Sequence, residues 1–215
     1  SNPATVTCAT TVSDPSCSFV YVSPTGTNSP TAGGPSNPCQ TLTGTDGALD
    51  RAAALGVKHI KMLVGSYTET GIIVMTTGLT IEGRFVKNGS IWEKNSSTSG
   101  NTTLTCSGSE SVSGVCHNVG VKASVNNWSL IDLNITTTNA SGTDASNRGC
   151  SHYGVLVRNC SNYTIERCKV TSGNASNGAS SSKVSGSGGA GGGGTAGSGG
   201  GGASGCGNPG AGTAG

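Results

Sequence analysis

Acidic side chains are few and scattered, which limits the acid–base chemistry that this chain can perform. No two of them are adjacent, and no two lie one residue apart on an expected strand. Hydrolysis of a polysaccharide needs a pair of carboxyl groups within about 10 Å of each other. The sequence therefore predicts no catalytic residue. The acidic residues are Asp14, Asp46, Asp50, Glu69, Glu82, Glu93, Glu110, Asp132, Asp144 and Glu166.

One group of charged residues still allows two interpretations. In an enzyme, Asp132, Glu166, Arg158 and Lys169 would share one cleft and divide the roles of acid, base and electrostatic stabiliser. In the simpler interpretation, Asp132 and Arg167 occupy equivalent positions of a repeat and form a solvated ion pair between neighbouring strands. We favour the ion pair.

The remaining chemistry-bearing residues lack the spacing of known sites. His59, His117 and His152 are far apart, and the chain has no Cys-x-x-Cys pair, so no metal site is predicted. A Gly-x-Ser-x-Gly nucleophile elbow between a strand and a helix is absent, and no Lys-Ser/Thr follows the glycine-rich stretch as in a phosphate loop. The sequence thus predicts no cofactor.

Aromatic residues are the other candidates for ligand binding. Trp92 and Trp128, together with Tyr163, could form a platform on which sugar rings stack. The alternative is that each ring packs against a neighbouring strand, or beneath the first sugar of a nearby glycan. We favour packing.

The nine cysteines indicate an oxidising compartment, since reduced proteins without metal-ligand spacing seldom carry so many. The odd number leaves one thiol that is free or bonded to another chain. We expect Cys160 and Cys168 to be structural, with one of them bonded to Cys150 or to a cysteine of a neighbouring strand. Because Cys168 occupies the repeat position of Leu133, its side chain should point inward. The disulfide candidates are Cys8, Cys17, Cys39, Cys106, Cys116, Cys150, Cys160, Cys168 and Cys206.

Asn-x-Ser/Thr triplets crowd the middle of the chain and indicate N-glycosylation. A chain rich in Asn, Ser and Thr generates some triplets by chance, but chance does not explain their absence from residues 1–87. Glycans around Asn127 and Asn162 would obstruct a polymer-binding groove, and these two sites share a repeat position, so we expect joint occupancy. The predicted sites are Asn88, Asn95, Asn101, Asn127, Asn134, Asn139, Asn159, Asn162 and Asn174.

The overall composition excludes several classes of partner. Charged residues make up 10% of the chain, the net charge is +2, and no basic run interleaved with aromatics suggests nucleic-acid binding. No apolar stretch approaches the roughly 18 residues of a spanning helix. The chain opens at Ser1 without a charged and then apolar segment, so we expect a targeting segment to have been removed. These features predict a secreted protein, extracellular or at the cell surface.

Short strands separated by turns dominate the expected secondary structure. Asp46 is the expected N-cap of the only convincing helix, 48–55, and Gly56 ends it. The remaining apolar segments are strand-sized and bounded by turn residues. The expected strands are 19–22, 59–64, 72–75, 79–81, 103–105, 119–121, 130–135, 155–157 and 164–170.

An internal repeat predicts how these strands are arranged. Asn-Trp-Ser-Leu at 127–130 and Asn-Tyr-Thr-Ile at 162–165 lie 35 residues apart, each preceded by a Gly-Val strand, and a weaker copy occupies 71–83. Repeats of strand, turn and strand are typical of a solenoid in which each coil stacks on the last. The inserted segments 84–118 and 138–152 should form loops on one side.

Part of the sequence resembles a known family. Val-Tyr-Val-Ser-Pro-Thr-Gly at 20–26, Pro-Cys-Gln-Thr-Leu at 38–42, the alanine-rich helix and Val-Gly-Ser-Tyr-Thr-Glu at 64–69 resemble the opening of right-handed parallel β-helix proteins of the pectin-lyase-like superfamily. The segment 162–170 resembles one of their rungs. The resemblance covers 19–83 and 119–172 and implies a β-helix capped by the N-terminal helix. It says little about activity, although the family includes polysaccharide lyases and hydrolases.

The organisation that follows is an all-β chain in three parts. Residues 1–18 form a cysteine-containing arm, 19–183 a right-handed parallel β-helix solenoid with a short N-terminal capping helix, and 184–215 a glycine-rich C-terminal segment. Glycine loses more entropy than other residues on ordering. If 184–215 is ordered, we expect glycine-rich polyproline-II packing or a neighbouring subunit to hold it, with Cys206 near the contact.

These expectations favour an extracellular, N-glycosylated structural protein that assembles with itself into a filament, fibre or surface layer. Its predicted partners are further copies of the chain and covalent N-glycans, with an extracellular polysaccharide as a further candidate. The alternatives are a carbohydrate-binding adhesin and a polysaccharide lyase or hydrolase.

Overall fold

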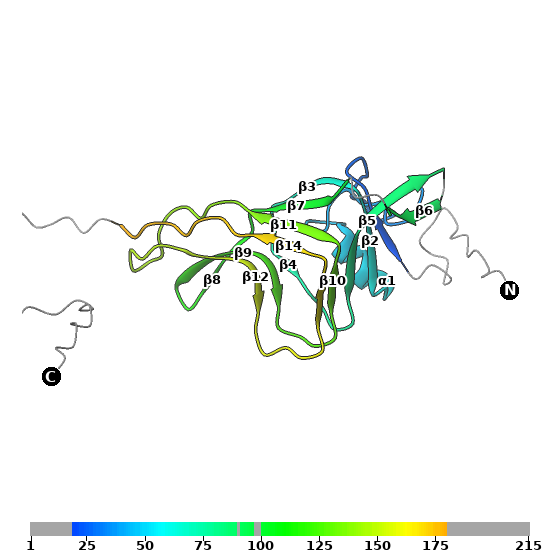
Figure 1. Cartoon of the computed structure of the whole chain (residues 1–215). Helices are drawn as coiled ribbons and strands as arrows, with labels where there is room; N and C mark the ends of the chain where they lie inside the picture. The colour runs from blue at the N-terminus through cyan, green and yellow to red at the C-terminus, as the bar shows by residue number, and fades with distance from the viewer. Residues whose placement is uncertain (1–18, 90, 97–99, 180–215) are drawn as a thin grey trace, which may run out of the picture. The chain divides into compact units, whose positions relative to one another are not determined.

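The computed structural model describes residues 19–89, 91–96 and 100–179, and strands dominate this part of the chain (Figure 1). The expected arm 1–18 and the segment 184–215, with Cys8, Cys17 and Cys206, lie outside the described residues. The predicted all-β class is confirmed. The strands are β1 Val20–Val22, β2 His59–Leu63, β3 Gly65–Glu69, β4 Ile73–Val74, β5 Thr80–Asn88, β6 Ile91–Lys94, β7 Thr102–Cys106, β8 Ser109–Val112, β9 Val115–Ala123, β10 Ser129–Ile131, β11 Leu133–Thr137, β12 Ser151–Val157, β13 Thr164–Glu166 and β14 Lys169–Thr171.

The strands form three sheets whose main pairings are parallel. The first sheet has the order β1-β2-β5-β10-β13, the second β14-β11-β7-β3 and the third β12-β9-β4. Along the chain, β2, β3 and β4 enter the three sheets in turn, as do β5, β7 and β9, and then β10, β11 and β12. Two further strands pair antiparallel at the periphery, β6 with β5 and β8 with β9.

The register places equivalent residues of the repeat side by side. Ser129 pairs with Thr164, and Asn134 pairs with Lys169, so both sheets keep the 35-residue offset. Burial alternates along the inner strands such as β2, β7 and β11, which is the pattern of a sheet with one face on a core. The inward positions of neighbouring strands form apolar columns, such as Ile60, Ile81 and Leu130 in the first sheet.

Corners between the sheets depend on residues with left-handed backbone. Asp132 separates β10 from β11 with φ 55°, and Arg167 separates β13 from β14 with φ 50°. The expected continuous strands 130–135 and 164–170 are therefore each broken into two. Asn127 and Asn162, with φ 60° and 53°, precede β10 and β13. Asparagine tolerates this conformation better than most residues, which explains its place in both copies of the repeat.

The helix α1, Ala48–Leu55, has the predicted bounds and ends at Gly56 in the left-handed conformation. Its N-cap is Gly47, so the assignment of Asp46 as N-cap is wrong. Asp46 has φ 55°, and an N-cap residue needs an extended backbone. The buried Ala48 and Ala52 pack on the core.

The outer edge of β1 is covered by the segment 33–39. Tyr21 N donates to Gly33 O at 2.9 Å, and Cys39 N donates to Tyr21 O at 2.9 Å. Glu69, at the end of β3, is fully buried and holds the loop before α1, because its carboxylate accepts hydrogen bonds from Leu42 N and Thr43 N at 2.7 and 2.9 Å. The outer edge of β1 is therefore covered, and the loop before α1 is fixed to β3.

The segment 84–118, expected as an inserted loop, contains more regular structure than predicted. It includes the end of β5, the strands β6, β7 and β8, and the start of β9. β7 is an internal strand of the second sheet, because it pairs with both β3 and β11. Among the described strands, β6 and β8 are the two that lie off the main path of their sheets, each paired antiparallel with its neighbour in sequence.

Candidate functional site

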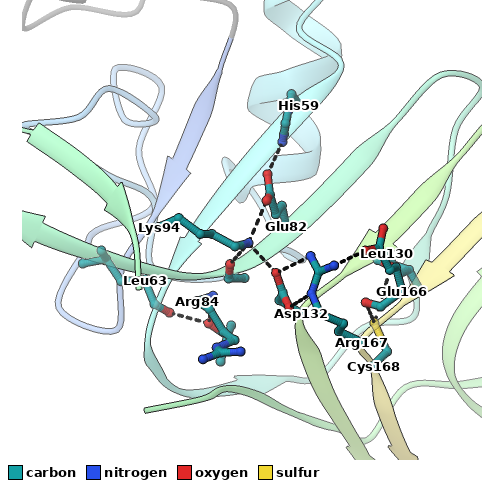
Figure 2. A network of polar contacts seen from close by, with 12 residues as sticks. His59, Leu63, Glu82, Arg84, Lys94, Leu130, Asp132, Glu166, Arg167 and Cys168 are labelled. Carbon is teal, nitrogen blue, oxygen red and sulfur yellow. Dashed lines mark hydrogen bonds and ion pairs between the residues drawn. The ribbon is translucent and has the colours of Figure 1, made fainter. Parts of the chain in front are cut away.

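Charged side chains from separate parts of the chain converge beside the first sheet, at its corner with the second. His59 lies on β2, Glu82 on β5 and Lys94 on β6, whereas Asp132 and Arg167 occupy the corners after β10 and β13 (Figure 2). We call these five residues, with Glu166, the charged network.

Asp132 is the centre of the charged network, and its side chain is only 1% exposed. Arg167 donates to both of its oxygens, from Nε to Oδ1 at 2.6 Å and from Nη2 to Oδ2 at 3.0 Å. Lys94 Nζ lies 2.6 Å from Oδ2 on the other side. The expected contact between Asp132 and Arg167 is confirmed. The pair was expected to be solvated, and this expectation is wrong for Asp132. The β5–β6 hairpin brings Lys94 over its carboxylate and buries it.

Lys94 links Asp132 to a second carboxylate. Its Nζ donates to Glu82 Oε1 and to Gly83 O, both at 2.7 Å. The other oxygen of Glu82, Oε2, lies 3.0 Å from Nε2 of His59. Arg167 also contacts Glu166, its neighbour in sequence. Each carboxylate oxygen of Asp132 and Glu82 thus already has a cationic or ring-nitrogen partner.

The electrostatics keep both carboxylates ionised at neutral pH. Hydrogen bonds from Arg167 and then Lys94, opposed by burial, lower the pKa of Asp132 to about 2. Burial raises the pKa of Glu82, but the contacts with Lys94 and His59 outweigh it and the net shift is downward. Burial lowers the pKa of His59 despite the attraction of Glu82. A general acid needs a pKa near the working pH, which neither carboxyl group has.

The structure brings together only part of the cleft considered from the sequence. Asp132 and Glu166 are joined through Arg167. Arg158 and Lys169 are exposed, and neither forms an ion pair within the described residues. Sequence reasoning missed His59, Glu82 and Lys94. The repeat register could have found Glu82, which pairs with Ile131 just as Glu166 does, whereas Lys94 depends on an antiparallel hairpin outside the repeat.

A second feature is a polar cavity of about 560 Å³ beside a disulfide bond. The disulfide joins Cys116 and Cys150, so the expected bond from Cys150 to Cys160 or Cys168 is wrong. Glu110 lies on the cavity wall and accepts a hydrogen bond from Lys122 Nζ at 2.6 Å. Most of the other lining side chains carry hydroxyl or amide groups, namely Ser107, Ser109, Ser111, Asn118, Thr138, Asn139, Ser141 and Thr143.

The other described cysteines are unbonded thiols. Cys39 and Cys106 are buried, and burial raises the pKa of the first to about 11 and of the second to about 12. Cys160 and Cys168 are half-buried and pack against the core. The inward orientation expected for Cys168 is therefore confirmed. Thiols with raised pKa values are poor nucleophiles, so Cys39 and Cys106 act as small apolar core residues.

The histidines occupy separate places. The buried His117 packs beside Tyr153, and Nδ1 of His152 lies 2.8 Å from Ser172 Oγ. Within the described ranges, no three His, Cys, Asp or Glu side chains are arranged to hold a metal ion.

The aromatic residues pack mainly against each other. Trp92 lies with its ring centroid 4.8 Å from that of Tyr21, and its Nε1 donates to Pro35 O. Trp128 is buried and stacks on the exposed Tyr163 with centroids 4.9 Å apart. A joint sugar-stacking platform of Trp92, Trp128 and Tyr163 is therefore not formed, because the Trp128 ring does not face solvent.

The asparagines of the predicted glycosylation sites are accessible. Asn95 and Asn134 are half-buried, and the others are exposed. Asn127 and Asn162 occupy the same corner on neighbouring strands of the first sheet, and the backbone N–H of Asn127 donates to Ser161 O at 3.2 Å. Both would carry their sugars at neighbouring points on the surface.

No helix in the described part of the chain is long and apolar enough to cross a membrane. Comparison with known proteins found no matching protein-family model, curated protein or solved structure.

Proposed function

We propose that this chain is an extracellular, N-glycosylated structural protein, built on a right-handed parallel β-helix and assembled with further copies into a filament, fibre or surface layer. The observation that carries the proposal is the placement of the glycosylation triplets, whose asparagines are all exposed or half-buried on a stack of parallel strands. Such a stack is rigid, and sugars on its surface do not interrupt its core.

The solenoid is supported by the order in which the chain enters the three sheets. Three times in succession, one strand in the first sheet is followed by one in the second and one in the third. A chain that repeats this path in parallel register advances by one strand spacing per turn. Parallel crossover connections are right-handed in nearly all proteins, which supports the handedness. The sequence resemblance to pectin-lyase-like proteins agrees with this fold.

The closed state of the charged network supports a structural role over a catalytic one. Asp132 is buried and bonded to both Arg167 and Lys94, so it cannot take or give a proton without breaking two ion pairs. The groups cross-link the corners of β10 and β13 to the β5–β6 hairpin. The charged network therefore stabilises the stack.

Three measurements test the proposal. The intact mass of the native protein should exceed the mass of its polypeptide, to which these 215 residues contribute 20.9 kDa, by several sugar chains. It should fall to the polypeptide mass after enzymatic deglycosylation. Peptide mapping should find Asn127 and Asn162 occupied together. Electron microscopy of native material should reveal regular assemblies. A bare chain, or a glycosylated chain that is monomeric in its native setting, contradicts the proposal.

A second candidate is carbohydrate binding in the polar cavity. Its volume of about 560 Å³ falls within the range of small-molecule sites, roughly 300 to 1,000 Å³. Hydroxyl and amide groups beside the Glu110 carboxylate suit a polyhydroxylated ligand. Binding on a glycan array that is lost in Glu110→Ala and kept in Glu93→Ala would favour this function.

A further inference from the structure

The polar cavity is lined by two segments that are far apart in sequence. Residues 109–111 of β8 belong to one side, residues of the loop 138–143 after β11 belong to the other, and the Cys116–Cys150 disulfide forms part of the wall. Among the described lining residues there is no aliphatic or aromatic side chain. The cavity therefore offers hydrogen bonds rather than apolar contact.

The loop 138–143 contains one of the predicted glycosylation triplets, Asn139-Ala140-Ser141. Both Asn139 and Ser141 line the cavity, and both are exposed. Of the predicted glycosylation asparagines, all of which the structure describes, Asn139 is the one on the cavity wall. A glycan attached to this residue begins at the cavity.

The carboxamide of Asn139 is already oriented by the following coil. Its Oδ1 accepts a hydrogen bond from the backbone N–H of Asn174 at 2.9 Å, whereas its Nδ2 has no hydrogen-bond partner within the described residues. An N-glycan is attached through Nδ2. A bond forms from Nδ2 to the anomeric carbon of a sugar, while an activated glycosyl donor loses its carrier and Nδ2 loses one proton. Attachment thus leaves the bond that orients the side chain intact.

The backbone of the loop is fixed as well. Ala140 N donates to Asn174 O at 2.8 Å, and Ser176 Oγ donates to Gly142 O at 2.6 Å. These bonds tie the loop to the segment that follows β14. The asparagine therefore lies at a fixed place beside the cavity.

The size and the chemistry of the cavity suit sugar rings. Its volume of about 560 Å³ falls within the range of small-molecule sites, roughly 300 to 1,000 Å³. Serine and threonine hydroxyls and asparagine amides both donate and accept hydrogen bonds, as sugar hydroxyls do. Glu110 adds a carboxylate, in which Oε2 accepts from Lys122 Nζ at 2.6 Å and Oε1 is available to a sugar hydroxyl.

Covalent attachment removes the main obstacle to binding in such a site. A soluble sugar loses translational and rotational freedom and must shed bound water from its polar groups, so purely polar contacts hold it weakly. A sugar tethered to the wall binds in an intramolecular step at high effective concentration. Contacts that are too weak for a soluble sugar therefore suffice for a tethered one.

We propose that the first sugars of the Asn139 N-glycan occupy the polar cavity and form hydrogen bonds with β8 and with the loop 138–143. The proposal rests on the proposed function, because it requires N-glycosylation, and it specifies where one glycan lies. The bound sugars connect the β8–β9 hairpin to the loop after β11. They take the place of the soluble carbohydrate considered above as a second candidate.

Two variants of Ser141 separate the glycan from the protein side chains. Ser141→Ala destroys the triplet but keeps Asn139 and its hydrogen bond from Asn174, whereas Ser141→Thr keeps the triplet. Peptide mapping should find Asn139 occupied in the wild type and in Ser141→Thr, and empty in Ser141→Ala. In urea unfolding, we expect Ser141→Ala to raise the unfolding equilibrium constant about tenfold relative to Ser141→Thr, because the hydrogen bonds of the bound sugars are lost.

Two controls show whether that difference comes from the cavity. Ser161→Ala removes the triplet of Asn159, and Ser161 is exposed and is not among the cavity residues. Loss of that glycan should change the unfolding constant by less than about twofold. When the Ser141→Ala and Ser141→Thr chains are produced without N-glycosylation, they should unfold alike.

Enzymatic release of the glycans measures their accessibility directly. An amidase that cleaves the bond between sugar and asparagine must reach Nδ2 of each site. In the folded wild type, it should release the Asn139 glycan at least about tenfold more slowly than the Asn159 glycan, because the first sugars at Asn139 are enclosed. After denaturation, the two glycans should be released at equal rates.

The outcomes distinguish this proposal from the proposed function. An empty Asn139 in a chain that carries glycans at its other sites overturns the occupied cavity and leaves the structural function standing. So does an occupied Asn139 whose glycan is released as fast as that of Asn159. A protected Asn139 glycan on a chain that is monomeric in its native setting contradicts the structural function and leaves the occupied cavity standing. A chain without any glycan overturns both.

Discussion

At the scale of single residues, Asp132 shows how a buried charge is made tolerable. Removing a carboxylate from water costs several kcal/mol unless partners compensate. Arg167 and Lys94 supply three close contacts, at 2.6, 3.0 and 2.6 Å, and both can reach solvent themselves. The arrangement fixes Asp132 at a corner where its backbone is left-handed, a conformation that aspartate adopts more readily than most residues.

Loss of Arg167 should destabilise the fold because it removes two of these contacts from a buried carboxylate. We expect Arg167→Ala to lower the free energy of unfolding by about 1–3 kcal/mol, the usual cost of an unsatisfied buried group. Because Lys94 still pairs with Asp132 in this variant, the loss of stability should be smaller than for a buried carboxylate with no partner. Arg158→Ala, on an exposed arginine without an ion pair in the described part of the chain, should change stability by less than about 0.5 kcal/mol. Urea unfolding of both variants makes the comparison, and equal values would contradict the role of the network.

Acid should weaken the fold through Asp132. Its folded pKa is lowered to about 2, below the unfolded value of about 3.9. The stabilisation is therefore complete above the unfolded pKa and is lost as the pH falls through about 2. Unfolding of the wild type and of Asp132→Asn should differ at neutral pH and converge near the folded pKa. A stability difference that does not depend on pH would show that Asp132 acts by shape alone.

At the scale of elements, close stacking of strands explains the glycines that begin each copy of the repeat. A Cβ on Gly120 of β9 would lie 2.7 Å from Gly154 O and 2.7 Å from Thr137 Cγ2. A Cβ on Gly154 of β12 would lie 2.4 Å from Val170 Cγ1. The third sheet therefore approaches the second sheet at a distance that only glycine allows.

Filling this space should cost stability. We expect Gly120→Ala to lower the unfolding free energy by about 1–3 kcal/mol, because the backbone oxygen of Gly154 cannot move aside without breaking strand pairing. Thermal denaturation monitored by circular dichroism measures the loss. Ser124→Ala, on an exposed residue just after β9, is the control and should be nearly neutral. A stable Gly120→Ala variant would mean that the sheets can separate locally.

At the scale of the whole molecule, the disulfide joins successive passages of the chain through the third sheet. Cys116 on β9 and Cys150 just before β12 are 34 residues apart in sequence. The bond therefore reinforces the strand pairing that carries the repeat, and it also forms part of the wall of the polar cavity.

Removing this disulfide should destabilise the chain more than removing an unbonded thiol. We expect the double variant Cys116→Ser, Cys150→Ser to lose about 2–4 kcal/mol, mainly because the unfolded chain regains entropy. Cys160→Ser, at a half-buried free cysteine, is the matched control with a smaller loss. Denaturant unfolding under oxidising conditions compares them. If both changes cost the same, the disulfide contributes nothing beyond the packing of its side chains.

The sequence by itself determined the features that depend on local pattern. Alternating apolar residues and turn residues predicted the strands, the alanine-rich segment predicted α1 with the observed bounds, and the repeat predicted the pairing of Ser129 with Thr164. These predictions agree with the structure because a repeat places equivalent residues in equivalent surroundings. The inward position of Cys168 followed for the same reason.

Only the tertiary structure decided the contacts that join non-equivalent parts of the chain. Lys94 reaches Asp132 because a hairpin outside the repeat folds back over the first sheet. The disulfide, in contrast, follows the register of the third sheet, because the pairing of Ser151 with His117 places Cys150 beside Cys116. The exposure of Ile165 could not be predicted from its residue type. Leu130 occupies the equivalent inward position on the neighbouring strand and is buried. What differs is whether a further strand lies beyond it, and that depends on where the stack of described strands ends.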